Sequence, residues 1–364
     1  MKILLLGEYS NVHWTLAEGL RELGHQVTVA SNGDFWKNYP RDIDLNRKPT
    51  KIGGIKLMAK VFSLLPLWRN YDVVQLINPI FIELKAERLF PIYHYLRRHN
   101  KKMVMGGFGM DWYWVDTCIQ KRPLRYSDFN IGDKLRTDAP AIKEQHDWLG
   151  TTKEKLNKMI ASDCDAIVTG LYEYDVCYRP YFPEKTHFIP MPIRLPHTYN
   201  TERCKRSKVV IFIGINRERS QYKGTDIMLQ AAQDLTKKYG HRMKLVTAES
   251  VPFEEYQQLM DGSDAILDQL YAYTPSMNPL LAMSKGIICI GGGEPENYQI
   301  IHEEELRPII NVQPTYESVY HELENLILHP ERIPTLKWQS REYVRRHHDY
   351  LKVARQYESL YRSL

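Results

Sequence analysis

Short apolar runs rich in β-branched residues alternate with helix-like patterns along the first half of the chain. Between the first two runs, Leu16, Leu20 and Leu23 recur at helical spacing before Gly24, a residue type that commonly ends helices. Strands that alternate with helices are typical of a parallel sheet covered by helices. We therefore predict strands at residues 2–6, 26–30, 72–77, 102–105, 165–169 and 187–189.

A second series of the same kind follows a stretch that disfavours regular structure. Residues 190–196 read PMPIRLP and a polar run occupies 199–207, so we expect a linker there. The pattern predicts an α/β protein with two tandem Rossmann-like, doubly wound domains, residues 1–195 and 196–348. The strands predicted for the second domain are 208–213, 244–246, 265–268, 287–290 and 308–312.

Composition and charge limit the classes of function that this chain can have. Hydrophobic residues make up 43% and charged residues 26% of the 364 residues, as in ordinary globular proteins. The net charge of +5 comes from residues 1–195, which hold 28 Lys and Arg against 22 Asp and Glu. This excess is too small for a nucleic-acid-binding surface, so no nucleic acid partner is expected. The five cysteines are scattered without a C-x-x-C pair, which favours a reducing, cytoplasmic compartment.

Two segments have the composition of a membrane-binding surface, although neither approaches the roughly 20 apolar residues that span a bilayer. Apolar residues at 55–68 and 89–96 are flanked by lysines and arginines. The pattern predicts either ordinary amphipathic helices or a peripheral contact with the inner face of a membrane. The basic residues concerned are Lys56, Lys60, Arg97, Arg98, Lys101 and Lys102.

Ligands of open α/β sheets bind beyond the carboxyl ends of the strands, so the loops there are the first candidates. The loop at 7–13 lacks the G-x-G-x-x-G pattern of dinucleotide cofactors. Its small polar residues precede a helix and can receive a hydroxylated or anionic ligand. Gly7 and Ser10 are candidates for donor binding. Asn11 and His13 are candidates for the acceptor side, unless the loop is an ordinary turn in which His13 caps the helix.

The loop at 106–111 reads GGFGMD, and its three glycines indicate close backbone approach or positive φ. Asp111 is either a catalytic residue that orients a sugar hydroxyl or the acceptor nucleophile, or the N-cap of the next helix. Trp112 either stacks on a sugar or acceptor or packs in the core. The polar stretch at 112–149 is expected to be a lid, a binding loop or a local helical insert.

The loop at 214–224 carries cations at the end of a strand. Arg217 and Lys223 lie six residues apart between this strand and a helix, where they can bind a diphosphate near Asn216. The loop lacks the G-x-x-x-x-G-K-[ST] pattern of a Walker loop. Solvated surface charge is the alternative.

A helix start and a glutamate pair follow farther along. Asn278 before Pro279 predicts an N-cap with proline at the first helical position, and helix N-termini bind anions. A buried strand at 289–293 then ends in glycines ahead of two glutamates. The donor-binding candidates in these segments are Ser276, Met277, Asn278, Glu294 and Glu296.

In order and spacing, these segments resemble the retaining, family 4 type glycosyltransferases of GT-B fold over nearly the whole chain. The resemblance implies two domains that face a cleft, with the C-terminal helix at 349–364 packed back on the first domain. The matching segments are 16–20 (LAEGL), 24–29 (GHQVTV), Arg217 with Lys223-Gly224, 280–286 (LLAMSKG), 292–296 (GGEPE) and 349–357 (DYLKVARQY).

The resemblance also implies a reaction. A sugar passes from a nucleotide-diphosphate sugar, with UDP favoured, to a saccharide or lipid-linked acceptor in polysaccharide biosynthesis. Arg217 and Lys223 clamp the diphosphate, and the helix from Pro279 meets its phosphates. Asp111 positions the acceptor. The resemblance implies transfer with retention, and no cofactor is expected. Transfer is also expected to need no metal, because no Asp-x-Asp lies in a loop expected to face the cleft.

One departure from the family concerns donor recognition. The family commonly has two glutamates separated by seven residues, the first touching the donor sugar and the second the ribose; here these positions are Tyr273 and Leu281. Because leucine cannot accept a hydrogen bond, we hypothesise that Glu294 or Glu296 does so instead. Glu294 is favoured because it departs from the family's usual apolar residue. The alternatives are a non-catalytic nucleotide-sugar-binding subunit, an inverting GT-B transferase and a sugar-nucleotide epimerase.

Overall fold

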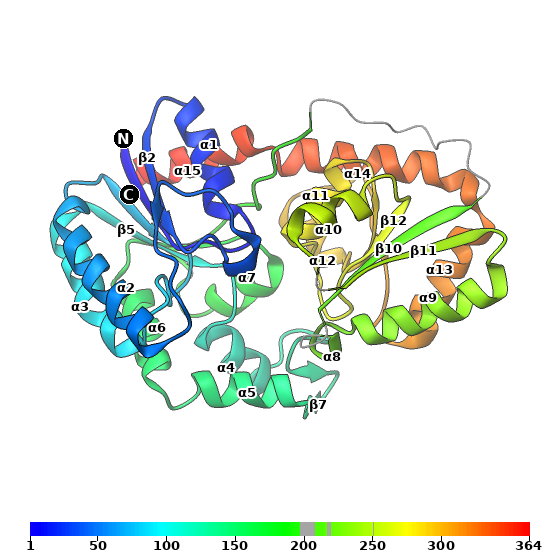
Figure 1. The fold of residues 1–364 in the computed structure, drawn as a ribbon, viewed down its shortest axis with the longest axis horizontal. Coiled ribbons are helices and arrows are strands. Elements are labelled where there is room, and N and C mark those ends of the chain that lie inside the picture. The colour runs from blue at the N-terminus through cyan, green and yellow to red at the C-terminus, as the bar shows by residue number, and fades with distance from the viewer. Residues whose placement is uncertain (197–207, 217–219, 250) are drawn as a thin grey trace. The chain divides into compact units, whose positions relative to one another are not determined.

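The chain folds into two compact units (Figure 1). The computed structural model describes residues 1–196, 208–216, 220–249 and 251–364. The prediction of an α/β protein with two doubly wound, parallel-sheet domains is confirmed. The first unit comprises Met1–Lys121, Lys143–Pro192 and Tyr350–Leu364. The second comprises Arg122–Ile142 and Ile193–Asp349.

A seven-stranded parallel sheet forms the centre of the first unit, in the order β3-β2-β1-β4-β5-β8-β9. Its central strands are buried apolar runs, as expected for a parallel sheet with both faces covered. The order reverses between β1 and β4, which makes their carboxyl ends the switch point of this sheet. The strands are β1 (Lys2–Leu6), β2 (Gln26–Ser31), β3 (Ile43–Asp44), β4 (Val73–Leu76), β5 (Lys102–Gly107), β8 (Ala166–Thr169) and β9 (Thr186–Phe188).

Helices connect these strands, and the last helix of the chain packs on the first. A Cβ at Gly19 would lie 2.7 Å from the Cβ of Ala354, so glycine allows α1 and α15 to touch. The helices are α1 (Val12–Glu22), α2 (Lys51–Leu64), α3 (Ala86–His99), α4 (Trp112–Gln120), α6 (Thr152–Asp163), α7 (Tyr172–Tyr178) and α15 (Tyr350–Ser363), with short 3-10 turns η1 (Phe35–Lys37) and η2 (Leu65–Leu67). The residues of α5 (Ala139–Trp148) are divided between the two units, which meet in sequence after Ile142.

The second unit has a five-stranded parallel sheet in the order β11-β10-β12-β13-β14. This is the 2-1-3-4-5 order of doubly wound sheets, with its switch point between β10 and β12. The strands are β10 (Val209–Ile215), β11 (Met243–Glu249), β12 (Ala265–Leu267), β13 (Ile288–Gly291) and β14 (Ile310–Asn311). The helices are α8 (Ser220–Lys223), α9 (Thr225–Tyr239), α10 (Phe253–Met260), α11 (Met277–Ser284), α12 (Pro295–Ile300), α13 (Tyr316–Leu328) and α14 (Ile333–His347), with the turn η4 (Pro330–Arg332).

Residues 122–142, which we call the inserted segment, pack with the second unit although the chain on both sides belongs to the first. The segment includes a small antiparallel hairpin, β6 (Asn130–Ile131) and β7 (Lys134–Leu135). The sequence predicted one uninterrupted first domain. The difference arises because the segment's polar side chains find their partners more than 80 residues away in sequence.

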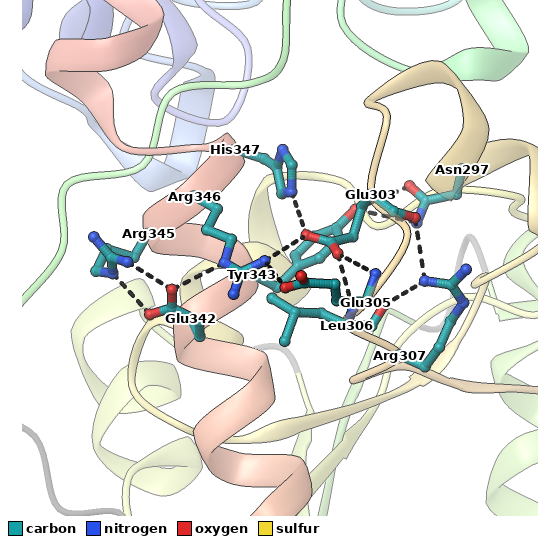
Figure 2. A network of polar contacts seen from close by, with 10 residues as sticks. All are labelled: Asn297, Glu303, Glu305, Leu306, Arg307, Glu342, Tyr343, Arg345, Arg346 and His347. Atoms are coloured by element: carbon teal, nitrogen blue, oxygen red, sulfur yellow. Dashed lines mark hydrogen bonds and ion pairs between the residues drawn. The ribbon is translucent and has the colours of Figure 1, made fainter.

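A network of charges fixes the end of α14 within the second unit (Figure 2). Glu303 accepts the backbone N–H groups of Glu305 and Leu306, and its second oxygen lies 2.7 Å from Nε2 of His347. Arg346 adds an ion pair to Glu305 at 2.7 Å. Burial alone raises the pKa of Glu303, but these hydrogen bonds and the His347 charge hold it below its ordinary value.

The described parts of the chain contain no helix with the length and apolarity that a bilayer crossing requires.

Candidate functional site

The loop between β1 and α1 is a tight turn that depends on glycine. Gly7 has φ of +85°, and a Cβ there would lie 2.2 Å from Cγ2 of Ile77. Ser10 and Asn11 also have positive φ, 52° and 73°. The N–H of Ser10 donates to Asp34 at 2.8 Å. The predicted donor roles of Gly7 and Ser10 and the acceptor role of Asn11 stay predictions.

His13, on the same loop, faces the interior. Its ring is fully buried, with Nδ1 2.8 Å from the Gly7 oxygen and Nε2 3.1 Å from the Gln75 amide nitrogen. Burial lowers the pKa of His13 to about 3, so the ring is neutral. Both nitrogens have partners inside the protein, which is at odds with the predicted acceptor-side role. Glu8 accepts the first helical N–H groups, from His13 and Trp14.

A small pocket opens in the first unit at the carboxyl ends of β1, β2 and β4. Its polar lining includes Glu8, Tyr9, Asn32 and Glu83. Burial raises the pKa of Glu8 to about 8 and that of Glu83 above its ordinary value. Both Glu8 oxygens accept backbone N–H groups at the start of α1. Such a lining suits a hydroxylated ligand better than an anion.

Asp111 and Trp112 are both enclosed. Asp111 is the N-cap of α4: its carboxyl accepts the Trp114 N–H at 2.9 Å and the Tyr178 hydroxyl at 2.6 Å. Burial raises the pKa of Asp111 to about 7, and its side chain has no exposed surface. Trp112 is buried and packs edge-on against Tyr113 at 4.9 Å. In the structure Asp111 is thus the N-cap of a helix, and Trp112 packs in the core. Because both side chains are enclosed, their placement is at odds with direct contact to an acceptor.

The switch point of the second sheet brings together a lysine and an aspartate. Burial raises the pKa of Asp268, at the end of β12, and the positive charge of Lys223 opposes that rise. Asn216 follows β10 and is exposed. The other predicted clamp residue, Arg217, lies outside the described residues. The charge of Lys223 is thus placed where a ligand of this sheet is expected.

Helix α11 begins at the same switch point, two residues earlier than predicted. It starts at Met277 rather than Pro279, and Ser276 is the N-cap without a side-chain capping bond. Asn278 therefore lies in the first turn, where its amide approaches Asp268 at 3.4 Å. The first N–H groups of a helix lack intrahelical partners and carry the positive end of its dipole. This end of α11 and the Lys223 charge both lie near Asp268, where they can supply hydrogen-bond donors to a phosphate.

Glu294 and Glu296 are bound to the inserted segment. The Arg125 guanidinium lies 2.7 Å from Glu294 and 2.6 Å from Glu296. The Tyr126 hydroxyl donates to Glu294 at 2.5 Å, and the Arg125 N–H donates to the Tyr273 hydroxyl at 2.6 Å. A ribose or sugar can reach these carboxylates only by sharing them with Arg125 or displacing it. Their predicted role as donor-binding residues stays a prediction.

Sequence reasoning missed two arginines of the inserted segment, Arg125 and Arg136. Arg136 is buried and donates to the carbonyl oxygens of Gln221 and Tyr222 at 2.9 and 3.1 Å. Neither arginine lies after a predicted strand or within a recognisable motif. The available signal was the unusual length of the stretch at 112–149, which indicated an insert without showing where it packs.

The fold is shared with sugar-nucleotide enzymes. No protein-family profile matches the sequence, and no curated protein is significantly similar to it. Sucrose-phosphate synthase from Thermosynechococcus elongatus is 14% identical, with a TM-score of 0.64 over 100% of this chain and 99% of its own. HepE of Anabaena, solved with UDP-glucose, is 14% identical with a TM-score of 0.60 over 100% of both chains.

A third similar structure belongs to another enzyme class. A Listeria monocytogenes protein assigned as a UDP-N-acetylglucosamine 2-epimerase is 10% identical, with a TM-score of 0.57 over 100% of this chain and 96% of its own. At these identities the likeness shows the fold alone. The chain therefore has the GT-B fold, in which both transferases and epimerases occur.

Proposed function

We propose that this protein is a glycosyltransferase that moves a sugar from a nucleotide-diphosphate sugar, UDP being the favoured carrier, to a saccharide or lipid-linked acceptor. The observation that carries the proposal is that Lys223 and the first turn of α11 both lie near Asp268 at the switch point of the second sheet. The similar structures solved with UDP and UDP-glucose support it.

The chemistry follows from charge. When the bond from the sugar to the diphosphate breaks, negative charge develops on the departing phosphate, and preorganised donors stabilise it. Lys223 supplies a full charge and α11 supplies backbone N–H groups. Retention is part of the proposal: the acceptor hydroxyl attacks from the side of the leaving group and gives its proton to a donor phosphate oxygen. No side chain has to act as the base in that step.

Metal-independent transfer belongs to the same proposal. The sequence has Asp-x-Asp at 42–44 and at 163–165. In the structure these carboxylates form ion pairs with arginines, which makes them poor candidates for a metal site: Asp42 with Arg21, Asp44 with Arg41, and Asp163 and Asp165 with Arg97. Activity is therefore expected to survive a strong chelator. Complete loss that magnesium or manganese restores would contradict this part of the proposal.

We place the acceptor at the mouth of the small pocket of the first unit, which is too small to enclose a whole sugar ring. Glu8, Tyr9 and Asn32 there can exchange hydrogen bonds with sugar hydroxyls. Asp111 is enclosed as a helix cap, near enough to Tyr9 for its charge to add to the effect of burial in raising the pKa of that hydroxyl, and we do not place it in contact with the acceptor.

The test is a calorimetric screen of nucleoside diphosphates, followed by transfer assays with mono- and oligosaccharide and polyprenyl-phosphate-linked acceptors. Binding of UDP, together with acceptor-dependent release of UDP from a UDP-sugar, supports the proposal. Conversion of the UDP-sugar to a new UDP-sugar without any acceptor identifies the epimerase alternative. Binding with neither transfer nor slow hydrolysis identifies the non-catalytic subunit, and product anomer analysis separates retention from inversion.

Helix α2 supports the finer proposal of a peripheral membrane contact. Ile52, Ile55 and Phe62 lie on one side of the helix and are 66%, 62% and 50% exposed. Lys56 and Lys60 lie beside this apolar stripe. Residues 35–67 hold seven lysines and arginines against two aspartates. An apolar stripe bordered by cations is the arrangement that binds an anionic bilayer surface.

Vesicle co-sedimentation tests this contact. Vesicles that contain phosphatidylglycerol should retain the protein, and Ile55→Glu should release most of it. Leu328→Glu, a change at an exposed leucine of the second unit, is the matched control and should leave binding unaltered. Equal binding of Ile55→Glu and the wild type would remove α2 from the proposal.

A further inference from the structure

A buried arginine of the inserted segment holds the helix that carries Lys223. Arg136 is 8% exposed, and its two terminal nitrogens donate to the carbonyl oxygens of Gln221 and Tyr222 at 2.9 and 3.1 Å. These are the two residues before Lys223 in the short helix α8. The carbonyls of the last turn of a helix are short of partners, and the Gln221 carbonyl accepts a long 3.3 Å bond from the Gly224 N–H, so a cation placed there adds to their hydrogen bonding.

The guanidinium is itself held in place. Its Nε donates to Asp138 at 2.9 Å, and its centre lies 4.0 Å from the centre of the Tyr271 ring. A second contact ties the same helix to the segment, because the Tyr222 hydroxyl donates to Asp128 at 2.5 Å. The inserted segment therefore holds α8 through contacts to its backbone carbonyls and to the Tyr222 side chain.

Lys223 is also fixed from the other side. Its carbonyl oxygen accepts the Leu270 N–H at 2.9 Å, in the loop that follows β12. Gly224 has φ of +70°, and a Cβ there would lie 2.5 Å from Cβ of Leu270, so this approach requires glycine. With Arg136 on the two preceding carbonyls, the main chain of Lys223 is held from both directions.

We propose that Arg136 is a positioning residue for Lys223. It does not touch the donor; it fixes α8 so that the lysine charge is presented at the switch point without reorganisation when a diphosphate binds. Preorganised charges stabilise a ligand more than charges that must first be ordered. This inference rests on the proposed function, since it assigns Arg136 a part in diphosphate binding.

A double-mutant cycle tests the assignment. Dissociation constants of UDP and of uridine are measured for the wild type, Arg136→Gln, Lys223→Ala and the double variant. Arg136→Gln should weaken UDP binding about tenfold and leave uridine binding unchanged, because only the phosphates meet Lys223. On the Lys223→Ala background the same change should cause no further loss, because the two residues act as one unit.

Two further variants guard against trivial explanations. Arg136→Lys keeps the charge and can donate to one of the two carbonyls. It should therefore bind UDP more tightly than Arg136→Gln, and it keeps the inference testable if Arg136→Gln folds poorly. Arg122→Gln is the control, because this arginine of the same segment donates to the Asp133 carbonyl and should leave UDP binding unaltered.

The outcomes separate the inference from the function on which it rests. Losses that add in the double variant, or an equal loss for uridine, would overturn the positioning role while leaving the transferase proposal intact. Absence of UDP binding to the wild type, and of any other nucleoside diphosphate, would overturn both.

Discussion

Replacing Arg125 by alanine removes the guanidinium that joins the inserted segment to Glu294 and Glu296. Three side-chain hydrogen bonds are lost, at 2.6, 2.7 and 3.1 Å. Such bonds to charged groups contribute about 1.5 to 3 kcal/mol each when buried. The Arg125 side chain is 53% exposed, so water screens its charge and takes over part of its bonding. We therefore expect the variant to open the segment about 1 to 2 kcal/mol more easily, a factor of roughly 5 to 30 in the opening equilibrium.

Native-state hydrogen exchange measures this opening directly. Peptides that cover 122–142 should exchange about 5- to 30-fold faster in Arg125→Ala than in the wild type, while peptides from α9 should be unaffected. Arg122→Ala is the matched control from the same segment. Unchanged exchange at 122–142 in the Arg125 variant would refute the claim that this contact holds the segment.

The pH dependence of the same measurement adds a second check. Burial alone raises the pKa of Glu294, but hydrogen bonds from Tyr126, Asn311 and Gln313 and the charge of Arg125 hold it below its ordinary value. A carboxyl whose pKa is lowered by folding stabilises the native state above its ordinary pKa and loses that contribution as the pH falls through the lowered value. After correction for intrinsic rates, the difference between wild type and Arg125→Ala should therefore shrink in acid; a constant difference would show that charge is not its source.

Lys223→Ala should weaken UDP binding about 10- to 150-fold, as expected for lost charge-assisted bonds, without lowering the melting temperature appreciably. If Glu294 or Glu296 accepts hydrogen bonds from the ribose hydroxyls, replacing that residue by glutamine should abolish the preference for UDP over its 2′,3′-dideoxy analogue. An equal preference in the wild type and both variants would show that neither glutamate binds the ribose. Glu303→Gln should destabilise the second unit at neutral pH but not in acid. The pKa of Glu303 is lowered in the folded protein, so its carboxylate beside His347 stabilises the fold only while it is ionised. Urea unfolding at several pH values measures this.

The two sheets could be predicted because their strands carry a local signal. Ile3, Leu4, Leu5 and Leu6 are all fully buried, and a short apolar run of this kind that ends in glycine favours a central parallel strand. The switch-point loops could be predicted for the same reason, since strand order and handed crossovers place them at one edge. Helix starts were less certain: α11 begins two residues before the proline because Ser276 can also take the N-cap position.

The roles of buried polar residues could not be predicted, because they depend on partners distant in sequence. His13 looked like a ligand residue, yet one of its ring nitrogens meets Gln75, 62 residues away. Asp111 accepts the hydroxyl of Tyr178, 67 residues away. A short polar side chain after a strand is consistent with either a helix cap or a ligand contact, and only the surrounding packing decides between them.

Two departures from the pattern of the glycosyltransferases that the sequence resembles, Tyr273 and Glu294, have a common structural explanation. Tyr273 stands where the resemblance places a sugar-binding glutamate, and its hydroxyl accepts the N–H of Arg125. Its ring packs against Tyr126 with centres 4.8 Å apart, and Tyr126 in turn donates to Glu294, the carboxylate found where the family has an apolar residue. A glutamate at 273 would place a third carboxylate beside Glu294 and Glu296, and like charges at short range destabilise one another. Tyr273 and Glu294 therefore act together, because both contact Arg125 and Tyr126 and so hold the inserted segment.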